Sequence, residues 1–163
     1  MMSPSLDSNG WEAAEPMEEI QLTIPRKVSY LNLATTLSKQ VCQQIKECRD
    51  KKKFASDIEL CVSEACTNAI KYARSVDKDD VISIYFQIYS NKIIIKVQDR
   101  GSGFNLDDLP DPDIERIPER GYGLYIIRSK VDKVQYSRTE RGNFLTMIKY
   151  FMEKKKVMNG GTG

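Results

Sequence analysis

Two side chains spaced one helical turn apart, Glu64 and Asn68, could act together on one bound group. At about 100° per residue, Glu64, Asn68 and Lys71 fall within roughly 60° of one another along the edge of a helix. A carboxylate can orient or deprotonate a nucleophile, and an amide oxygen is a hard ligand of the kind that Mg²⁺ prefers. The same spacing also fits solvated positions on an amphipathic helix, so taken alone it decides nothing.

A second candidate stretch is Asp99-Arg100-Gly101-Ser102-Gly103-Phe104, at the end of an expected strand. A carboxylate leaving a strand can accept a hydrogen bond from the amine of adenine, and glycines after it let the backbone approach a ligand closely. A glycine-rich turn that needs positive φ would give the same pattern without any ligand.

The third stretch, Arg120-Gly121-Tyr122-Gly123-Leu124, opens an expected helix. Backbone N–H groups at a helix N-terminus form an anion site, and Arg120 could supply a positive charge to a terminal phosphate. A lone G-x-G is a weak signal, and these glycines could equally serve only the turn.

The elements that must position these residues follow from hydrophobic periodicity. Strands are expected at 19–24, 81–89, 92–98, 133–137 and 143–151, and helices at 28–48, 54–73 and 121–131. The second and third strands should form one hairpin, and the fourth and fifth another. The apolar stripe of the second helix should consist of Ile58, Cys61, Val62, Ala65 and Ala69. The second helix should begin at Ser56 or Asp57 as N-cap, and the lysines at 51–53 should follow the end of the first helix. This order predicts an α+β fold: a two-layer sandwich whose helices cover one face of a mixed, mostly antiparallel sheet.

Composition narrows the classes of function. Lys+Arg 25 against Asp+Glu 23 gives a net charge of +2, which does not point to a nucleic-acid partner. The sequence has no histidine, which excludes a Ser-His-Asp triad, a Cys-His dyad and histidine autophosphorylation. The four cysteines form no CxxC pair and are interpreted as reduced thiols. No apolar run is long enough for a membrane span, and no signal-peptide pattern is present, so we expect a cytoplasmic protein.

Together the three stretches resemble the N, G1 and G2 boxes of the GHKL (Bergerat-fold) ATPases, which include DNA gyrase and histidine kinases. The wording Ser63-Glu64-Ala65-Cys66-Thr67-Asn68-Ala69 is most similar to the anti-sigma factor serine/threonine kinases. The resemblance covers residues 18–152 as one ATP-binding kinase domain, with residues 1–17 and 153–163 as flexible tails.

The resemblance implies ATP and Mg²⁺ as ligands and a role for each matching residue. Glu64 would be the general base or orient the acceptor hydroxyl, and Arg120 would reach the γ-phosphate. Asn68 would ligate Mg²⁺, and Asp99 would bind the adenine amine. The remaining nucleotide-binding residues would be Gly101, Gly103, Phe104, Gly121, Tyr122, Gly123 and Leu124, with Lys71 added from its place on the helix edge. Residues 104–120 would form the ATP lid.

Two positions depart from the family pattern: Tyr72 stands where a histidine is common, and Asn143 follows Gly142 where related ATPases place a threonine. The second departure puts an adenine contact from that position in question.

The leading hypothesis is a bacterial kinase that phosphorylates a STAS-domain anti-anti-sigma protein, binds a sigma factor and forms a homodimer through the first strand and first helix. The alternative is an ATP-gated binding module without kinase activity. A detached sensor-kinase domain is disfavoured, because no phosphoacceptor helix pair precedes the domain.

Overall fold

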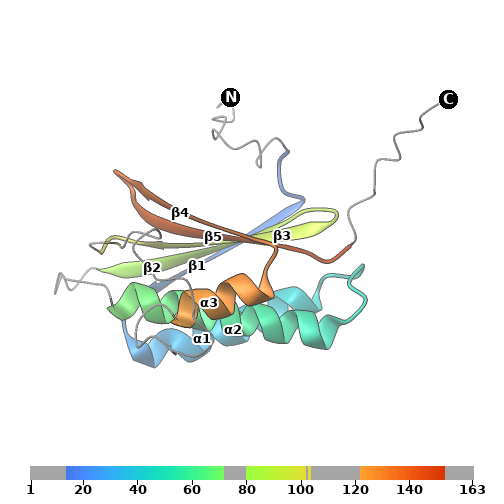
Figure 1. Cartoon of the computed structure of the whole chain (residues 1–163), viewed down its shortest axis with the longest axis horizontal. Helices are drawn as coiled ribbons and strands as arrows, with labels where there is room; N and C mark the ends of the chain where they lie inside the picture. The colour runs from blue at the N-terminus through green and yellow to red at the C-terminus, as the bar shows by residue number, and fades with distance from the viewer. Residues whose placement is uncertain (1–13, 72–79, 102, 104–121, 153–163) are drawn as a thin grey trace.

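The computed structural model describes residues 14–71, 80–101, 103 and 122–152. Within these ranges, five strands form one sheet, and three α-helices cover one of its faces (Figure 1). The strands are β1 (Glu18–Pro25), β2 (Val81–Ile88), β3 (Lys92–Asp99), β4 (Lys133–Thr139) and β5 (Gly142–Tyr150). The helices are η1 (Val28–Tyr30, a 3-10 turn), α1 (Leu31–Gln43), α2 (Lys51–Lys71) and α3 (Tyr122–Lys130). The predicted α+β two-layer fold is confirmed.

The sheet order is β1-β2-β3-β5-β4, and each of the four pairings is antiparallel. Both expected hairpins are present: Tyr89–Asn91 joins β2 to β3, and Glu140-Arg141 joins β4 to β5. In the sheet β3 lies between β2 and β5, and its pairing with β5 places Asp99 directly opposite Asn143. The turn after β3 and the start of β5 therefore lie at one end of the sheet.

The core lies between the helices and the inner face of the sheet. Alternate residues of β2 and β3 are fully buried there, including Ile84, Phe86 and Ile95. The predicted apolar stripe of α2 is confirmed, because its members are all buried: Ile58, Cys61, Val62, Ala65 and Ala69. Burial of this stripe fixes the rotation of α2 and leaves Glu64 and Asn68 half-buried at its margin.

Three expectations about the helices were wrong. The first helix ends at Gln43 instead of near residue 48, although Ile45 remains buried in the turn that follows. The lysines at 51–53 form the first turn of α2 instead of following α1. Asp50 replaces Ser56 and Asp57 as the cap, since its Oδ1 accepts a hydrogen bond from the backbone N–H of Lys53 at 3.2 Å.

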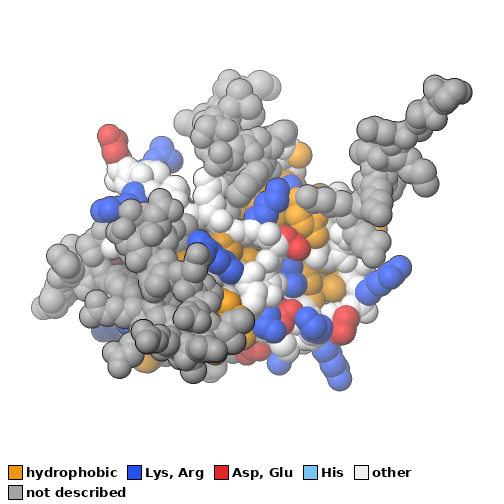
Figure 2. Space-filling view, viewed as in Figure 1, with side chains coloured by type: hydrophobic (Ala, Val, Ile, Leu, Met, Phe, Trp, Pro, Cys, Tyr) orange, Lys and Arg blue, Asp and Glu red, His pale blue; other side chains and the backbone are white. Residues whose placement is uncertain are grey.

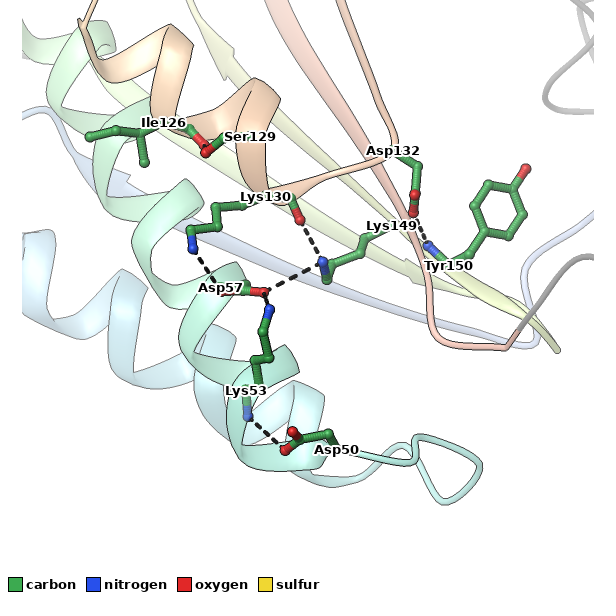
Figure 3. Close-up of polar contacts among 9 residues, drawn as sticks. All are labelled: Asp50, Lys53, Asp57, Ile126, Ser129, Lys130, Asp132, Lys149 and Tyr150. Carbon is green, nitrogen blue, oxygen red and sulfur yellow. Dashed lines mark hydrogen bonds and ion pairs between the residues drawn. The ribbon is translucent and has the colours of Figure 1, made fainter.

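Asp57 instead joins α2 to two other elements (Figure 3). Its carboxylate accepts a hydrogen bond from Lys53 Nζ at 3.0 Å, and Lys130 and Lys149 each lie 3.6 Å from it. Burial alone would raise the pKa of Asp57, but the lysine hydrogen bond and the neighbouring positive charges hold this pKa below its usual value. The cluster ties α2 to the end of α3 and to β5.

All four cysteines are free thiols, as the sequence interpretation expected. Cys42, Cys61 and Cys66 are buried, and burial raises the pKa of each thiol to about 12. Cys48 is half-buried. The buried thiols pack as small apolar side chains of the core.

The visible described surface carries side chains of both charges. Figure 2 shows Lys and Arg side chains in separate groups, interspersed with acidic and hydrophobic side chains on the visible described surface. Within the described ranges, no helix is long and apolar enough to cross a membrane. The ATP lid expected at 104–120, the tail at 153–163 and most of the tail at 1–17 lie outside the described residues.

Candidate functional site

The C-terminal end of α2, the N-terminal end of α3, the end of β3 and the start of β5 all lie at one end of the molecule, on the left in Figure 1. These four chain positions carry the candidate residues. Glu64 and Asn68 lie on α2, Gly123 lies on the first turn of α3, and Asp99 ends β3. The fold thus brings three sequence-distant stretches to the same end.

The contact between α2 and α3 is close at one glycine. A Cβ added to Gly123 would lie 2.6 Å from Glu64 Oε2 and 3.5 Å from both Nδ2 and Oδ1 of Asn68. A side chain at this position would therefore displace the Glu64 carboxylate. Leu124, the next residue, is buried in the core and holds this turn in place. The fold thus brings the first and third stretches into contact.

A second group of contacts surrounds Asp99. Its Oδ1 accepts a hydrogen bond from the backbone N–H of Gly101 at 2.8 Å and another from Asn143 Nδ2 at 3.1 Å. The same Asn143 nitrogen lies 2.9 Å from the carbonyl oxygen of Gly101. Asp99 is therefore held from its own turn and from the neighbouring strand at once.

Gly103 meets the prediction of a turn with positive φ. Its φ is +72°, and an added Cβ would lie 2.8 Å from the Tyr136 hydroxyl and 2.9 Å from Asn143 Oδ1. Both the backbone conformation and the lack of space require glycine here. A turn without any ligand therefore explains Gly103, but it does not explain the Asp99 carboxylate.

The remaining candidate residues are either exposed or outside the described residues. Lys71 is the last residue of α2 and is exposed, and Tyr122 begins α3 with 48% of its surface exposed. Phe104, Arg120 and Gly121 lie outside the described residues. Sequence reasoning treated Asn143 only as a departure and missed its contact with Asp99. Tyr136 gave no signal beyond strand alternation.

The donors around Asn68 fit Mg²⁺ that is bound together with a nucleotide. Among the described residues, no group of three or more His, Cys, Asp or Glu side chains could hold a metal ion. One amide oxygen beside a glycine-lined helix N-terminus instead suits Mg²⁺ that takes most of its ligands from phosphates and water.

A family model described as the histidine kinase-like ATPase domain matches residues 24–149. A serine-protein kinase RsbW of Bacillus thuringiensis (strain Al Hakam) is 30% identical over 155 residues, which cover 90% of this chain and 93% of the relative. The RsbW protein of Bacillus anthracis is 31% identical over 156 residues, with the same coverage. The chain belongs to the RsbW family of serine-protein kinases.

Solved structures support the fold of this RsbW-family chain. The RsbU and RsbW domains of Rv1364c from Mycobacterium tuberculosis match with a TM-score of 0.61 at 14% identity, covering 85% of this chain and 34% of that one. A histidine kinase domain from Erythrobacter litoralis EL346 matches with a TM-score of 0.50 at 22% identity, covering 78% and 62%. The expected resemblance to GHKL ATPases and the assignment to the serine/threonine protein kinases are confirmed.

Proposed function

We propose that this protein transfers the γ-phosphoryl group of ATP to a serine or threonine of a STAS-domain anti-anti-sigma protein, and that it also binds a sigma factor. The observation that carries the proposal is the approach of Gly123 to Glu64 and Asn68, with 2.6 Å between the Glu64 carboxylate and an added Cβ. It joins a carboxylate, an amide and a helix N-terminus, which are the groups that phosphoryl transfer needs.

In this proposal each residue has one task. Glu64 orients the acceptor hydroxyl or takes its proton, and Asn68 is the protein ligand of Mg²⁺, which offsets charge on the phosphates when bound. The N–H groups at the start of α3 donate to phosphate oxygens, and Asp99 accepts a hydrogen bond from the base amine. Phosphoryl transfer depends mainly on positioning and electrostatics, so few groups suffice.

Other site roles rest on the sequence alone. Arg120 supplies positive charge at the γ-phosphate, Gly121 adds a backbone donor, and Phe104 borders the base. Lys71 lies one turn from Asn68 on an exposed helix end, from which its long side chain could reach a phosphate. We place the kinase domain at residues 18–152.

The proposed setting is the bacterial cytoplasm, with control of transcription exerted through protein contacts. A homodimer through β1 and α1 is supported by exposed apolar side chains near the start of α1, with Val28 68% and Leu33 51% exposed. These side chains are available to a second copy of the chain.

The test compares Glu64→Gln with Glu59→Gln, the same substitution on the opposite side of α2. Purified proteins are incubated with γ-labelled ATP and candidate STAS-domain acceptors, and ATP binding is measured by calorimetry. Glu64→Gln should lose label transfer by about 100-fold or more and keep ATP binding, because a neutral amide cannot take the proton. Glu59→Gln should match wild type.

The outcome also decides between the kinase and the ATP-gated module. Wild-type protein that binds ATP and labels no acceptor would favour the module. Equal transfer by Glu64→Gln and wild type would remove Glu64 from the proposed chemistry.

A further inference from the structure

Asn143 is a buried polar side chain at a point where the sheet meets the candidate nucleotide site. It is the second residue of β5, only 5% of its surface is exposed, and its register partner on β3 is Asp99. A buried amide is retained at low cost only when its hydrogen bonds are made. The partners of Asn143 therefore indicate what it does.

The orientation of the Asn143 amide follows from chemistry. Nδ2 lies 2.9 Å from the Gly101 carbonyl oxygen and 3.1 Å from Asp99 Oδ1. Both neighbours can only accept hydrogen bonds when Asp99 is ionised, so the atom between them must be the nitrogen, which has two hydrogens to give. The amide thus links the end of β3 to the turn that follows it.

The consequence for Asp99 is that its two oxygens differ. Oδ1 accepts two hydrogen bonds, from Asn143 Nδ2 and from the Gly101 N–H at 2.8 Å. Within the described part of the chain, no hydrogen bond to Oδ2 is found. Two donors on one oxygen fix the carboxylate plane and leave the other oxygen available to a ligand donor.

We propose that Asn143 is a positioning residue that determines base selectivity, by holding Asp99 so that Oδ2 accepts a hydrogen bond from the exocyclic amine of a purine. This inference rests on the proposed nucleotide site. An ionised carboxylate attracts an amine and repels the carbonyl oxygen that guanine and hypoxanthine carry at the same position. The carbonyl of Gly101, held by the same amide, keeps the turn from moving away from the base.

The experiment measures binding of two nucleotides that differ only in this amine. ATP and purine riboside triphosphate are titrated by calorimetry, with Mg²⁺, into wild type, Asn143→Ala and Asn143→Thr. A hydrogen bond to an ionised group should make wild type prefer ATP by about tenfold or more. Asn143→Ala should lose most of that preference, because ATP binding weakens while purine riboside triphosphate binding changes by less than about twofold. Asn143→Thr keeps one donor and should restore part of the preference.

Ser83→Ala is the matched control. Ser83 is 9% exposed and shares a cross-strand hydrogen bond with Thr23 at 3.0 Å in the same sheet, on strands β1 and β2. A purely structural loss at Asn143 would weaken both nucleotides together, and Ser83→Ala should leave the preference for ATP unchanged.

The outcomes separate this inference from the proposed function. If wild type binds neither nucleotide, both are overturned. If wild type prefers ATP and Asn143→Ala keeps that preference, or weakens both nucleotides equally, only the positioning role of Asn143 is overturned. Should Asn143→Ala fail to fold, Asn143→Thr decides. An unchanged preference for ATP in Asn143→Thr, together with a crystal structure in which residue 143 makes no hydrogen bond to Asp99 Oδ1, would equally exclude the positioning role.

Discussion

Replacing Gly123 with alanine should separate the stability of α3 from the chemistry of the site. The added Cβ would lie 2.6 Å from Glu64 Oε2, whereas ordinary contacts begin at 3.4 Å, so the carboxylate must retreat by about 0.8 Å. The moving atom ends a flexible side chain, and its displacement costs little. Alanine also favours a helix over glycine by about 0.5–1 kcal/mol. The free energy of unfolding should therefore stay within about 1 kcal/mol of wild type.

Phosphoryl transfer should respond quite differently. A misplacement of about 1 Å in a catalytic group can lower a rate by about 100-fold, which corresponds to about 2.7 kcal/mol in activation free energy. The assay follows initial rates of label transfer from ATP to a STAS-domain acceptor at saturating ATP, with urea unfolding measured on the same samples. Ser129→Ala, at the exposed far end of α3, is the control and should match wild type in both measurements.

Two results would refute this reasoning. Transfer by Gly123→Ala within about twofold of wild type would mean that the position of the Glu64 carboxylate does not matter to the reaction. Loss of several kcal/mol in unfolding free energy would mean that the contact is rigid and that the Glu64 side chain cannot move aside.

Three further predictions concern stability and reactivity. Gly142→Ala should lower the unfolding free energy by about 1–3 kcal/mol in urea titrations, because φ is +122° and the new Cβ would press on the Asp99 carbonyl oxygen; wild-type stability would contradict this. Asp57→Asn should lower it by about 1.5–3 kcal/mol at neutral pH. The difference in unfolding free energy between Asp57→Asn and wild type should disappear as the pH falls below about 4. The pKa of Asp57 is lowered in the fold, so this side chain stabilises the fold only while its carboxylate is ionised. A difference that does not depend on pH would exclude the charge mechanism. At about pH 8, iodoacetamide should modify half-buried Cys48 faster than the other three thiols, because burial raises the pKa of Cys48 as well but raises theirs to about 12; mass spectrometry showing rapid modification of all four would contradict their burial.

Local sequence patterns were sufficient to predict the elements that are set mainly by burial of one apolar face. The alternation of β2 and β3 and the stripe of α2 follow from burial of one face, and both were predicted with bounds close to those observed. The close approach of Gly123 to Glu64 was not predicted, because no local pattern relates residues 59 positions apart.

The start of α2 could not be predicted because two local preferences compete. Three lysines at a helix N-terminus oppose the helix dipole, which favoured placing them after α1. In the structure the Asp50 cap outweighs this effect, and Asp57 offsets the charge of Lys53 one turn later at 3.0 Å. The lysines on α3 and β5 that complete the Asp57 cluster are tertiary neighbours, and no local pattern reveals them.

The role of Asn143 was also hidden from local reasoning. The sequence predicts the hairpin of β4 and β5, but the pairing of β5 with β3 joins segments about fifty residues apart. Only that pairing brings the amide to Asp99. The sequence showed that Asn143 stands where related ATPases place a threonine, but it did not show that Asn143 contacts Asp99.

The central claim is that α2, α3 and the end of β3 together bind one ATP with Mg²⁺. A crystal structure with a non-hydrolysable ATP analogue and Mg²⁺ tests it most directly. We predict that Asp99 contacts the adenine amine, that Asn68 binds the metal and that the N–H groups at the start of α3 donate to the phosphates. A nucleotide bound elsewhere, or bound with Asn68 and Asp99 both out of contact, would contradict it.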